Sequence, residues 1–219
     1  MIVLVTGANR GIGAELVRRH AARGDSVIAT TRGDVPGDLE HAARWETLDV
    51  ADPESVAALA ARLDGCEIDL LVCNAGVYLD KRQSLADGYA PDLWARTFAV
   101  NVTGVFLTVE AFLPHLARAK APKIAIVSSQ MGSNMRANGG SYIYRASKAA
   151  ATNLGRNLAT DLRDRGIAVG IYHPGWVRTD MGGSGGDISA EDSGAGLMAR
   201  FEALSLATTG EFLTWDGRT

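Results

Sequence analysis

Residues 6–13 are Thr6-Gly7-Ala8-Asn9-Arg10-Gly11-Ile12-Gly13, and they join a short apolar run, Ile2–Val5, to an amphipathic segment, Ala14–Arg23. The apolar run favours a β-strand, and the amphipathic segment favours an α-helix. Glycines at a strand-to-helix turn let the backbone turn sharply and approach a ligand closely. The free N–H groups at the start of the helix attract phosphate groups. The stretch therefore predicts a turn that binds the pyrophosphate of a dinucleotide.

Strand-like and helix-like segments alternate through the rest of the chain. Further strands are expected at Ser26–Thr31, Trp45–Val50, Ile68–Cys73, Lys123–Ser128, Ile167–Tyr172 and Glu211–Thr214. Further helices are expected at Pro53–Leu63, at Pro91–Arg118 with a break near Asn101 and Gly104, at Tyr142–Arg165 and at Glu191–Leu204. Short apolar strands that alternate with helices form a doubly wound parallel sheet with helices on both faces. We therefore expect one α/β domain over residues 1–219, a Rossmann fold with about seven strands.

The composition is that of an ordinary globular protein, with 47% hydrophobic and 21% charged residues. A net charge of −3 offers no electrostatic attraction for nucleic acid or an anionic membrane. Cys66 and Cys73 have no metal-like spacing, so we expect reduced cysteines and no metal site. No apolar run approaches the ~20 residues of a membrane span. The first strand begins at residue 2, which leaves no room for a signal peptide, and we expect a cytoplasmic protein.

A second motif, Tyr144-Arg145-Ala146-Ser147-Lys148, places a phenol and an ammonium group on one face of the predicted helix 142–165. A phenol with a pKa near 10 is a poor base at neutral pH. A nearby cation favours the phenolate and lowers that pKa. Tyr144 can then accept a proton from an alcohol or donate one to a carbonyl. The same pair is common on helix surfaces, so it indicates a site only in company with other motifs.

The T-G-x-x-x-G-x-G spacing of residues 6–13 resembles that of the short-chain dehydrogenase/reductase family, and further family motifs follow in order. They are Asn74-Ala75-Gly76, Asn101 within Val100–Gly104, Ser128-Ser129-Gln130-Met131-Gly132, the Tyr144/Lys148 pair, and Pro174-Gly175-Trp176-Val177-Arg178-Thr179. The resemblance covers residues 2 to about 216. Residues 142–148 and 173–183 are most similar to the C-factor and sniffer-type carbonyl reductase branch.

The resemblance implies four catalytic residues: Asn101, Ser129, Tyr144 and Lys148. Ser129 would hydrogen-bond the substrate oxygen, and Tyr144 would transfer the proton. Lys148 would lower the pKa of the phenol and bind the nicotinamide ribose. The backbone at Asn101 would hold a water that links the lysine to solvent.

The spacing leaves alternatives at two of these positions. Ser129 and Tyr144 are 15 residues apart, where many compact members of the family show about 13, and the extra residues fall in Ser133–Gly140. Ser128 is the alternative serine, although strand alternation would point its side chain to the opposite face. Tyr142 has no lysine four residues on, which favours a role in packing or in the pocket wall.

The resemblance also implies which residues contact the cofactor. They are Gly7, Asn9, Arg10, Gly11, Ile12, Gly13, Thr31, Arg32, Asp49, Val50, Asn74, Ala75, Gly76, Tyr144, Lys148, Pro174, Gly175, Val177 and Thr179. An acidic residue at the end of the second strand selects NAD by binding the adenosine ribose. Thr31 is neutral there, and Arg32 and Arg10 can bind a 2′-phosphate. We therefore favour NADP over NAD as the cofactor.

These motifs together predict an NADPH-dependent reductase of a ketone or aldehyde. The alternative is a cofactor-binding signalling protein of the C-factor type, in which catalysis is vestigial. A sugar-nucleotide epimerase or dehydratase is disfavoured, since only about 40 residues follow Thr179. Family members commonly associate through the two long helices, here about 91–118 and 142–165, which implies a homodimer or homotetramer.

The substrate itself is not specified by the motifs. The glycine-rich loop Met181–Ser189 is expected to lie over the nicotinamide and to be ordered by ligand. Further candidates for the pocket wall are Arg136, Tyr142, Trp176, Met181 and the segment Tyr78–Asp87.

Overall fold

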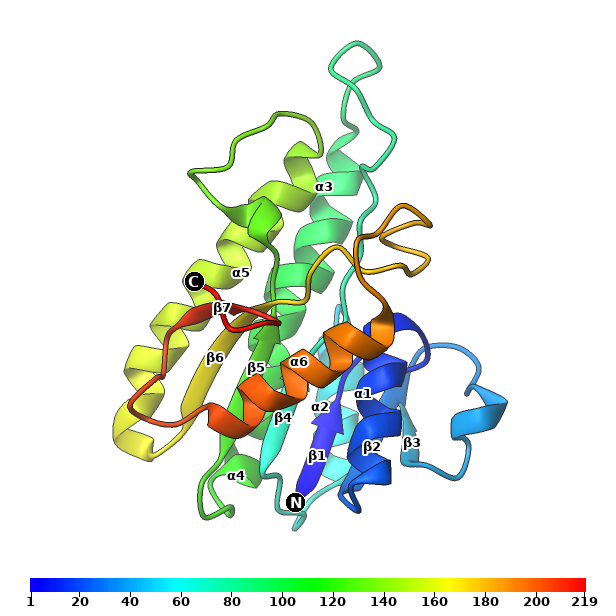
Figure 1. Ribbon diagram of the computed structural model, residues 1–219. Helices are drawn as coiled ribbons and strands as arrows, with labels where there is room; N and C mark the ends of the chain where they lie inside the picture. The colour runs from blue at the N-terminus through cyan, green and yellow to red at the C-terminus, as the bar shows by residue number, and fades with distance from the viewer.

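The computed structural model describes residues 1–219 and contains one seven-stranded sheet in which every neighbouring pair of strands is parallel (Figure 1). The strands are β1 (Ile2–Val5), β2 (Ser26–Thr31), β3 (Arg44–Thr47), β4 (Leu70–Cys73), β5 (Lys123–Val127), β6 (Ala168–His173) and β7 (Phe212–Thr214). Their order in the sheet is β3-β2-β1-β4-β5-β6-β7. This order confirms the predicted doubly wound α/β fold, with its reversal of direction between β1 and β4.

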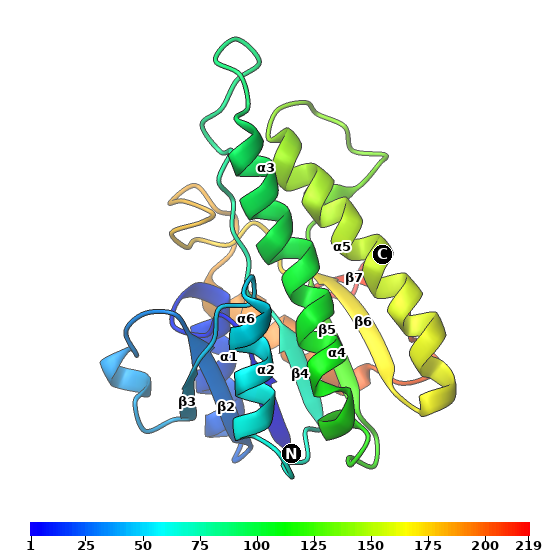
Figure 2. The same cartoon turned by 180° about the vertical axis from the view of Figure 1, so that it is seen from behind.

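Helices cover both faces of the sheet. They are α1 (Gly11–Ala22), α2 (Pro53–Arg62), α3 (Pro91–Phe98), α4 (Gly104–Leu116), α5 (Tyr142–Leu162) and α6 (Ala190–Ala203). Figure 1 shows α1 and α6 in front of the sheet, and Figure 2 shows α2, α4 and α5 on the opposite face. The loops after β4, β5 and β6 rise above the carboxyl ends of the strands, where they are free to surround a ligand (Figure 1).

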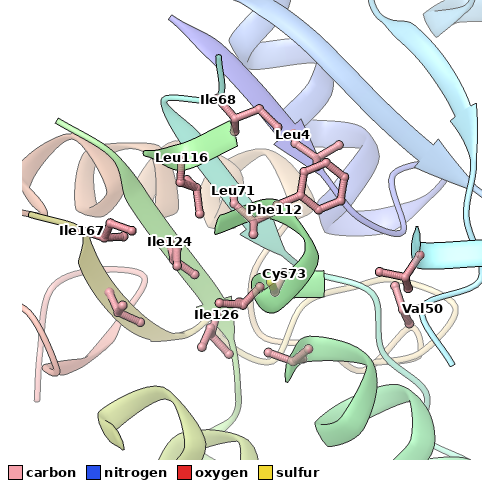
Figure 3. Close-up of a cluster of buried hydrophobic side chains, with 14 of the residues drawn as sticks. Leu4, Val50, Ile68, Leu71, Cys73, Phe112, Leu116, Ile124, Ile126 and Ile167 are labelled. Atoms are coloured by element: carbon pink, nitrogen blue, oxygen red, sulfur yellow. The ribbon is translucent and has the colours of Figure 1, made fainter. Parts of the chain in front are cut away.

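The central strands are apolar on both sides because each side faces a helical layer. In β5, Ile124 and Ile126 belong to the core beneath α2, α4 and α5 (Figure 3). Ala125 and Val127 belong to the second core, beneath α1 and α6. This alternation of sides follows from the two-residue repeat of a strand.

Most predicted boundaries differ from the structure by one to three residues, and two of the differences affect the core. The third strand, expected to end at Val50, ends at Thr47, although Leu48 and Val50 are buried in the core beyond it. The expected break in the long helix is a π-helical segment, Ala99–Thr103, that joins α3 to α4 without interruption. This segment brings Asn101 into the interior, where it is 1% exposed.

The continuous helix Pro91–Leu116 is long and apolar enough to cross a membrane, with a mean hydropathy of 1.4 over its best window. This corrects the expectation that no segment reaches that length, which overlooked how few charges lie between 91 and 116. Core helices of soluble proteins have the same character. Val109, Phe112 and Leu116 of this helix are fully buried in the core, where it lies between α2 and α5 (Figure 2).

Candidate active site

A cleft of about 400 Å³ opens at the carboxyl ends of the strands, around the reversal point between β1 and β4. Ligands of open parallel sheets bind at this point. Every predicted cofactor residue except Gly175 and Val177 lines the cleft: Gly7, Asn9, Arg10, Gly11, Ile12, Gly13, Thr31, Arg32, Asp49, Val50, Asn74, Ala75, Gly76, Tyr144, Lys148, Pro174 and Thr179. Val177 is instead buried beside Ile188, with which it forms a β-bridge.

The glycine turn packs against the end of β4 and has no room for a side chain at Gly13. A Cβ atom there would lie 2.3 Å from the Gly7 carbonyl oxygen and 2.6 Å from Asn74 Nδ2. Asn74 donates from that nitrogen to the Gly7 carbonyl at 2.9 Å. α1 begins at Gly11 without a side-chain cap, so N–H groups of its first turn can donate to phosphate oxygens. The turn therefore fits the pyrophosphate of a nicotinamide dinucleotide.

Tyr144 and Lys148 lie on the inner face of α5, at 8% and 5% exposed. The Lys148 ammonium lies 5.7 Å from the centre of the Tyr144 ring and donates to the Val127 carbonyl at 2.9 Å. Burial lowers the pKa of Lys148 to about 8, since an ammonium group loses hydration there. Burial likewise raises the pKa of Tyr144 to about 12, an effect that a hydrogen bond with Ser129 partly offsets. The protein groups in this structure thus do not produce the lowered phenol pKa that the sequence led us to expect.

The two candidate serines point in different directions, as strand alternation predicts. Ser128 borders the cleft, but its hydroxyl is committed to α5, at 2.9 Å from the Lys148 carbonyl and 2.8 Å from the Thr152 hydroxyl. Ser129 caps the 3-10 turn Gln130–Gly132, accepts from the Met131 N–H, and faces Tyr144. The Ser128 hydroxyl is thus already engaged with α5, whereas the Ser129 hydroxyl accepts one backbone N–H and, apart from its interaction with Tyr144, donates to no other group of the protein.

The 3-10 turn that carries Ser129 rests directly on the backbone of α5. A Cβ atom at Gly132 would lie 2.5 Å from the Ala149 nitrogen and 2.6 Å from the Lys148 carbonyl carbon. Only glycine allows this contact without displacing one of the two backbones. The last residue of the S-x-x-G pattern therefore fixes Ser129 relative to Lys148.

Asn101 connects the π-helical segment to both the loop after β4 and α5. Its side-chain nitrogen donates to the Val77 carbonyl at 2.9 Å and to the Ser147 hydroxyl at 3.0 Å. Its side-chain oxygen accepts from the Val77 N–H at 2.8 Å. With its amide fully engaged in this way, Asn101 holds α5 against the loop that borders the cleft.

Comparison with known proteins identifies the family. Residues 1–187 match the family described as short chain dehydrogenase. The chain belongs to the short-chain dehydrogenases. It is 39% identical to 1-hydroxy-2-glutathionyl-2-methyl-3-butene dehydrogenase of Rhodococcus sp. (strain AD45), over 98% of this chain and 96% of that protein. It is 40% identical to C-signal of Myxococcus xanthus, over 68% of this chain and 90% of that protein.

The fold is also that of a solved carbonyl reductase. The NADPH-bound carbonyl reductase from chicken fatty liver superposes with a TM-score of 0.90 at 32% identity, over 99% of this chain and 97% of that one. Together with the C-signal similarity, this confirms the resemblance to the C-factor and sniffer-type branch. The protein is thus an NAD(P)-dependent oxidoreductase by family.

Where the cleft passes the end of β2 and the glycine turn, this dehydrogenase has two exposed arginines, and Thr31 at the end of β2 is neutral. Arg32 pairs with Asp49 at 3.3 Å, and Arg10 pairs with Asp180 at 3.1 Å. The arginine side chains are 61% and 70% exposed. Ion pairs this exposed contribute only about 0–1 kcal/mol, so each guanidinium can exchange its carboxylate for a phosphate.

The predicted pocket wall is only partly assembled at the cleft. Met181 lines it, and its carbonyl accepts from Lys81 at 3.0 Å. Trp176 is 54% exposed and donates to the Gly182 carbonyl at 2.9 Å. Tyr142 and Arg136 do not line the cleft: Tyr142 packs edge-on against Tyr89, and Arg136 donates to Gln130.

Sequence reasoning named the segment Tyr78–Asp87 as a candidate for the pocket wall, but it did not predict the contacts that Tyr78 and Asp80 make with α5. The Tyr78 ring stacks on the Tyr144 ring at 4.3 Å between centres. Asp80 is a fully buried carboxylate that accepts backbone N–H groups at the start of α5. Neither lies in a motif, and both contacts join residues more than 60 positions apart. A local pattern in the sequence therefore had no means of revealing them.

Proposed function

We propose that this dehydrogenase reduces a ketone or aldehyde with NADPH, using Tyr144 as the proton donor. One observation carries the proposal: a buried phenol, close to Ser129 and Lys148, lines the same cleft as the glycine turn. Because burial raises the pKa of Tyr144 to about 12, its phenol is protonated at neutral pH. A protonated phenol suits the reductive direction, in which the carbonyl oxygen must gain a proton.

Different residues of the cleft would bind the cofactor, bind the substrate and transfer the proton. The glycine turn and the start of α1 would hold the pyrophosphate, and Lys148 would hold the nicotinamide ribose. The nicotinamide supplies the hydride when it is bound. Ser129 and Tyr144 would hydrogen-bond the carbonyl oxygen, and Tyr144 would donate its proton to that oxygen as negative charge develops there. The chain of contacts from Asn101 through Ser147 supports the helix that carries both groups.

We further propose NADP as the preferred cofactor, with Arg32 as a ligand of the 2′-phosphate. Arg32→Ala should lower kcat/KM for NADPH by roughly 10- to 100-fold, the value of one or two charged hydrogen bonds, and leave kcat/KM for NADH unchanged. Arg44→Ala is the matched control, because Arg44 is an exposed arginine that pairs with Glu46 away from the cleft. Equal loss with both cofactors, or wild-type turnover that is faster with NADH, would reject the NADP preference.

The second candidate function is a cofactor-binding signalling role, which the 40% identity to C-signal favours. Measuring the loss of NADPH absorbance with a panel of aldehydes, quinones and diketones distinguishes the two candidate functions. A secondary alcohol and a glutathione conjugate with NADP⁺ belong in the panel, because the Rhodococcus relative is named a dehydrogenase of a glutathionyl compound. Turnover of a carbonyl supports the reductase, whereas tight NADPH binding without any turnover supports the signalling role.

We also propose a cytoplasmic homodimer or homotetramer that associates through α4 and α5. Phe106 is 41% exposed on α4, and α5 carries the small, half-buried residues Ala149 and Ala150. Exposed apolar side chains commonly mark a surface that binds another protein, and small residues let two helices approach closely. Light scattering of the purified protein should give a mass of two or four chains, and a monomer at micromolar concentration would contradict the proposal.

A further inference from the structure

The carboxylate of Asp80 has no solvent-accessible surface and lies against the first turn of α5. It accepts the Ile143 N–H at 2.8 Å through one oxygen and the Tyr144 N–H at 3.2 Å through the other. Asp80 belongs to the irregular loop between β4 and α3, more than 60 residues before the helix it contacts. A buried charge is rare in proteins unless hydrogen bonds compensate for its lost hydration.

The start of α5 has no cap of its own. The first N–H groups of a helix have no partner within the helix, and the preceding residue commonly supplies a side-chain acceptor. Here the preceding residue is Ser141, which has a left-handed backbone (φ 48°) and makes no capping hydrogen bond. Asp80 takes over this function, and its negative charge is favourable at the positive end of the helix.

The same loop also holds the ring of the catalytic tyrosine. Tyr78, two residues before Asp80, stacks on the Tyr144 ring with an angle of 23° between the planes. The Tyr78 hydroxyl is hydrogen-bonded to the Ser141 hydroxyl, which ties down the left-handed residue before the helix. One short segment therefore contacts the backbone and the ring of Tyr144 and also the residue that precedes α5.

We propose that Asp80 is a positioning residue for Tyr144, which fixes the first turn of α5 so that the phenol meets Ser129 and the substrate oxygen. Tyr144 is the third residue of α5, within the turn that Asp80 caps. Lys148 lies one turn further on and has its own anchor at the Val127 carbonyl. Loss of the cap should therefore loosen Tyr144 and leave Lys148 in place. This inference rests on the proposed reductase function only for its effect on turnover.

Two variants and one control test the proposal. Asp80→Ala removes both acceptors, and Asp80→Asn keeps one oxygen and replaces the other with an amide donor that opposes an N–H group. Asp87→Ala is the control, because Asp87 is an exposed carboxylate of the same loop whose partner is Ser84. Thermal unfolding of all three variants establishes that each is folded.

The first measurement is amide hydrogen exchange by NMR, which needs no activity. In Asp80→Ala, the amides of Ile143 and Tyr144 should exchange at least about tenfold faster than in the wild type, because their acceptor is lost. The amide of Arg145 is the internal reference, since it donates to the Ser141 carbonyl within the helix at 2.9 Å. Asp87→Ala should leave all three amides unchanged. Unchanged exchange at Ile143 and Tyr144 in Asp80→Ala would overturn the assigned contact.

The second measurement is steady-state kinetics with a carbonyl substrate. We expect kcat to fall by roughly 10- to 100-fold in Asp80→Ala and by less in Asp80→Asn, with KM for NADPH within about twofold of the wild type. If the Ile143 and Tyr144 amides exchange faster in Asp80→Ala but kcat is unchanged, the cap does not position the phenol. If Asp80→Ala does not fold, the amide exchange rates and kcat of Asp80→Asn test the proposal, and the same outcomes support or overturn it. Wild-type protein without turnover would reject the reductase function, and the exchange data alone would then confirm or overturn the cap.

Discussion

Tyr144→Phe is expected to lower turnover by about 10²–10⁴-fold, the usual contribution of a positioned acid or base. The variant keeps the aromatic ring, and with it the stack on Tyr78, but has no proton to donate. Because the ring keeps its place between Tyr78 and Lys148, the affinity for NADPH should stay within about threefold of the wild type. Stopped-flow or steady-state absorbance of NADPH measures turnover, and fluorescence titration measures cofactor binding.

Tyr142→Phe is the matched control for this experiment. Tyr142 lies two residues earlier on α5, is 38% exposed, and does not line the cleft. Its hydroxyl can be removed without touching the proposed proton path, so turnover should remain near that of the wild type. Activity retained in Tyr144→Phe, or lost equally in Tyr142→Phe, would remove Tyr144 from its assigned role.

Lys148→Met should abolish most turnover and yet raise the melting temperature at pH 7. The ammonium group of Lys148 is buried with one carbonyl partner, and burial lowers its pKa from an ordinary 10.5 to about 8. Below pH 8 the folded protein therefore carries a charge that would be better hydrated in the unfolded chain. Methionine has a similar length without the charge. We expect a gain on the order of 2 kcal/mol, or roughly 5 °C, and a fall in kcat of about 10²-fold or more.

The stability difference between Lys148→Met and the wild type should depend on pH in a definite direction. Between pH 8 and 10.5 the unfolded chain binds a proton at Lys148 that the folded protein has released, so the stability contribution of this lysine rises with pH. The advantage of Lys148→Met should be largest below pH 8 and should shrink as pH rises toward 10.5. Lys120→Met, which changes an exposed lysine, should alter neither stability nor turnover. A lower melting temperature at pH 7, or a gap that widens with pH, would contradict the argument.

The fold was predictable because apolar strands and amphipathic helices alternate with little ambiguity. The error at β3 has a physical cause: Leu48 and Val50 are apolar because they enter the core, although the pairing with β2 stops at Thr47. The buried residues therefore extend beyond the last paired residue of the strand. A hydropathy pattern indicates burial but not where strand pairing ends. The π-helical form of Ala99–Thr103 could not be predicted either, because its sequence differs little from that of an ordinary helix.

The candidate site was predictable where the residues lie in motifs, and it was not predictable where contacts are made across the fold. The glycine turn and the Tyr144/Lys148 pair were recognised from local motifs, and the structure brings both to one cleft. The preference for Ser129 over Ser128 rested on the family resemblance and on strand alternation. The contact of Asp80 with α5 could not be predicted, because an aspartate in a loop gives no indication of the helix that it will cap. The raised pKa of Tyr144 was missed for a similar reason, since burial depends on the assembled structure.

The contact of Gly132 with the backbone of α5 has a consequence for how the protein can diversify. Residues 133–140 leave this contact and return to α5 at Ser141, so the loop begins and ends on one rigid support. Its length can change at a cost of only about 0.6 kcal/mol per doubling, without any change in the distance between Ser129 and Tyr144. The long serine–tyrosine spacing is thus an insertion outside the reaction geometry.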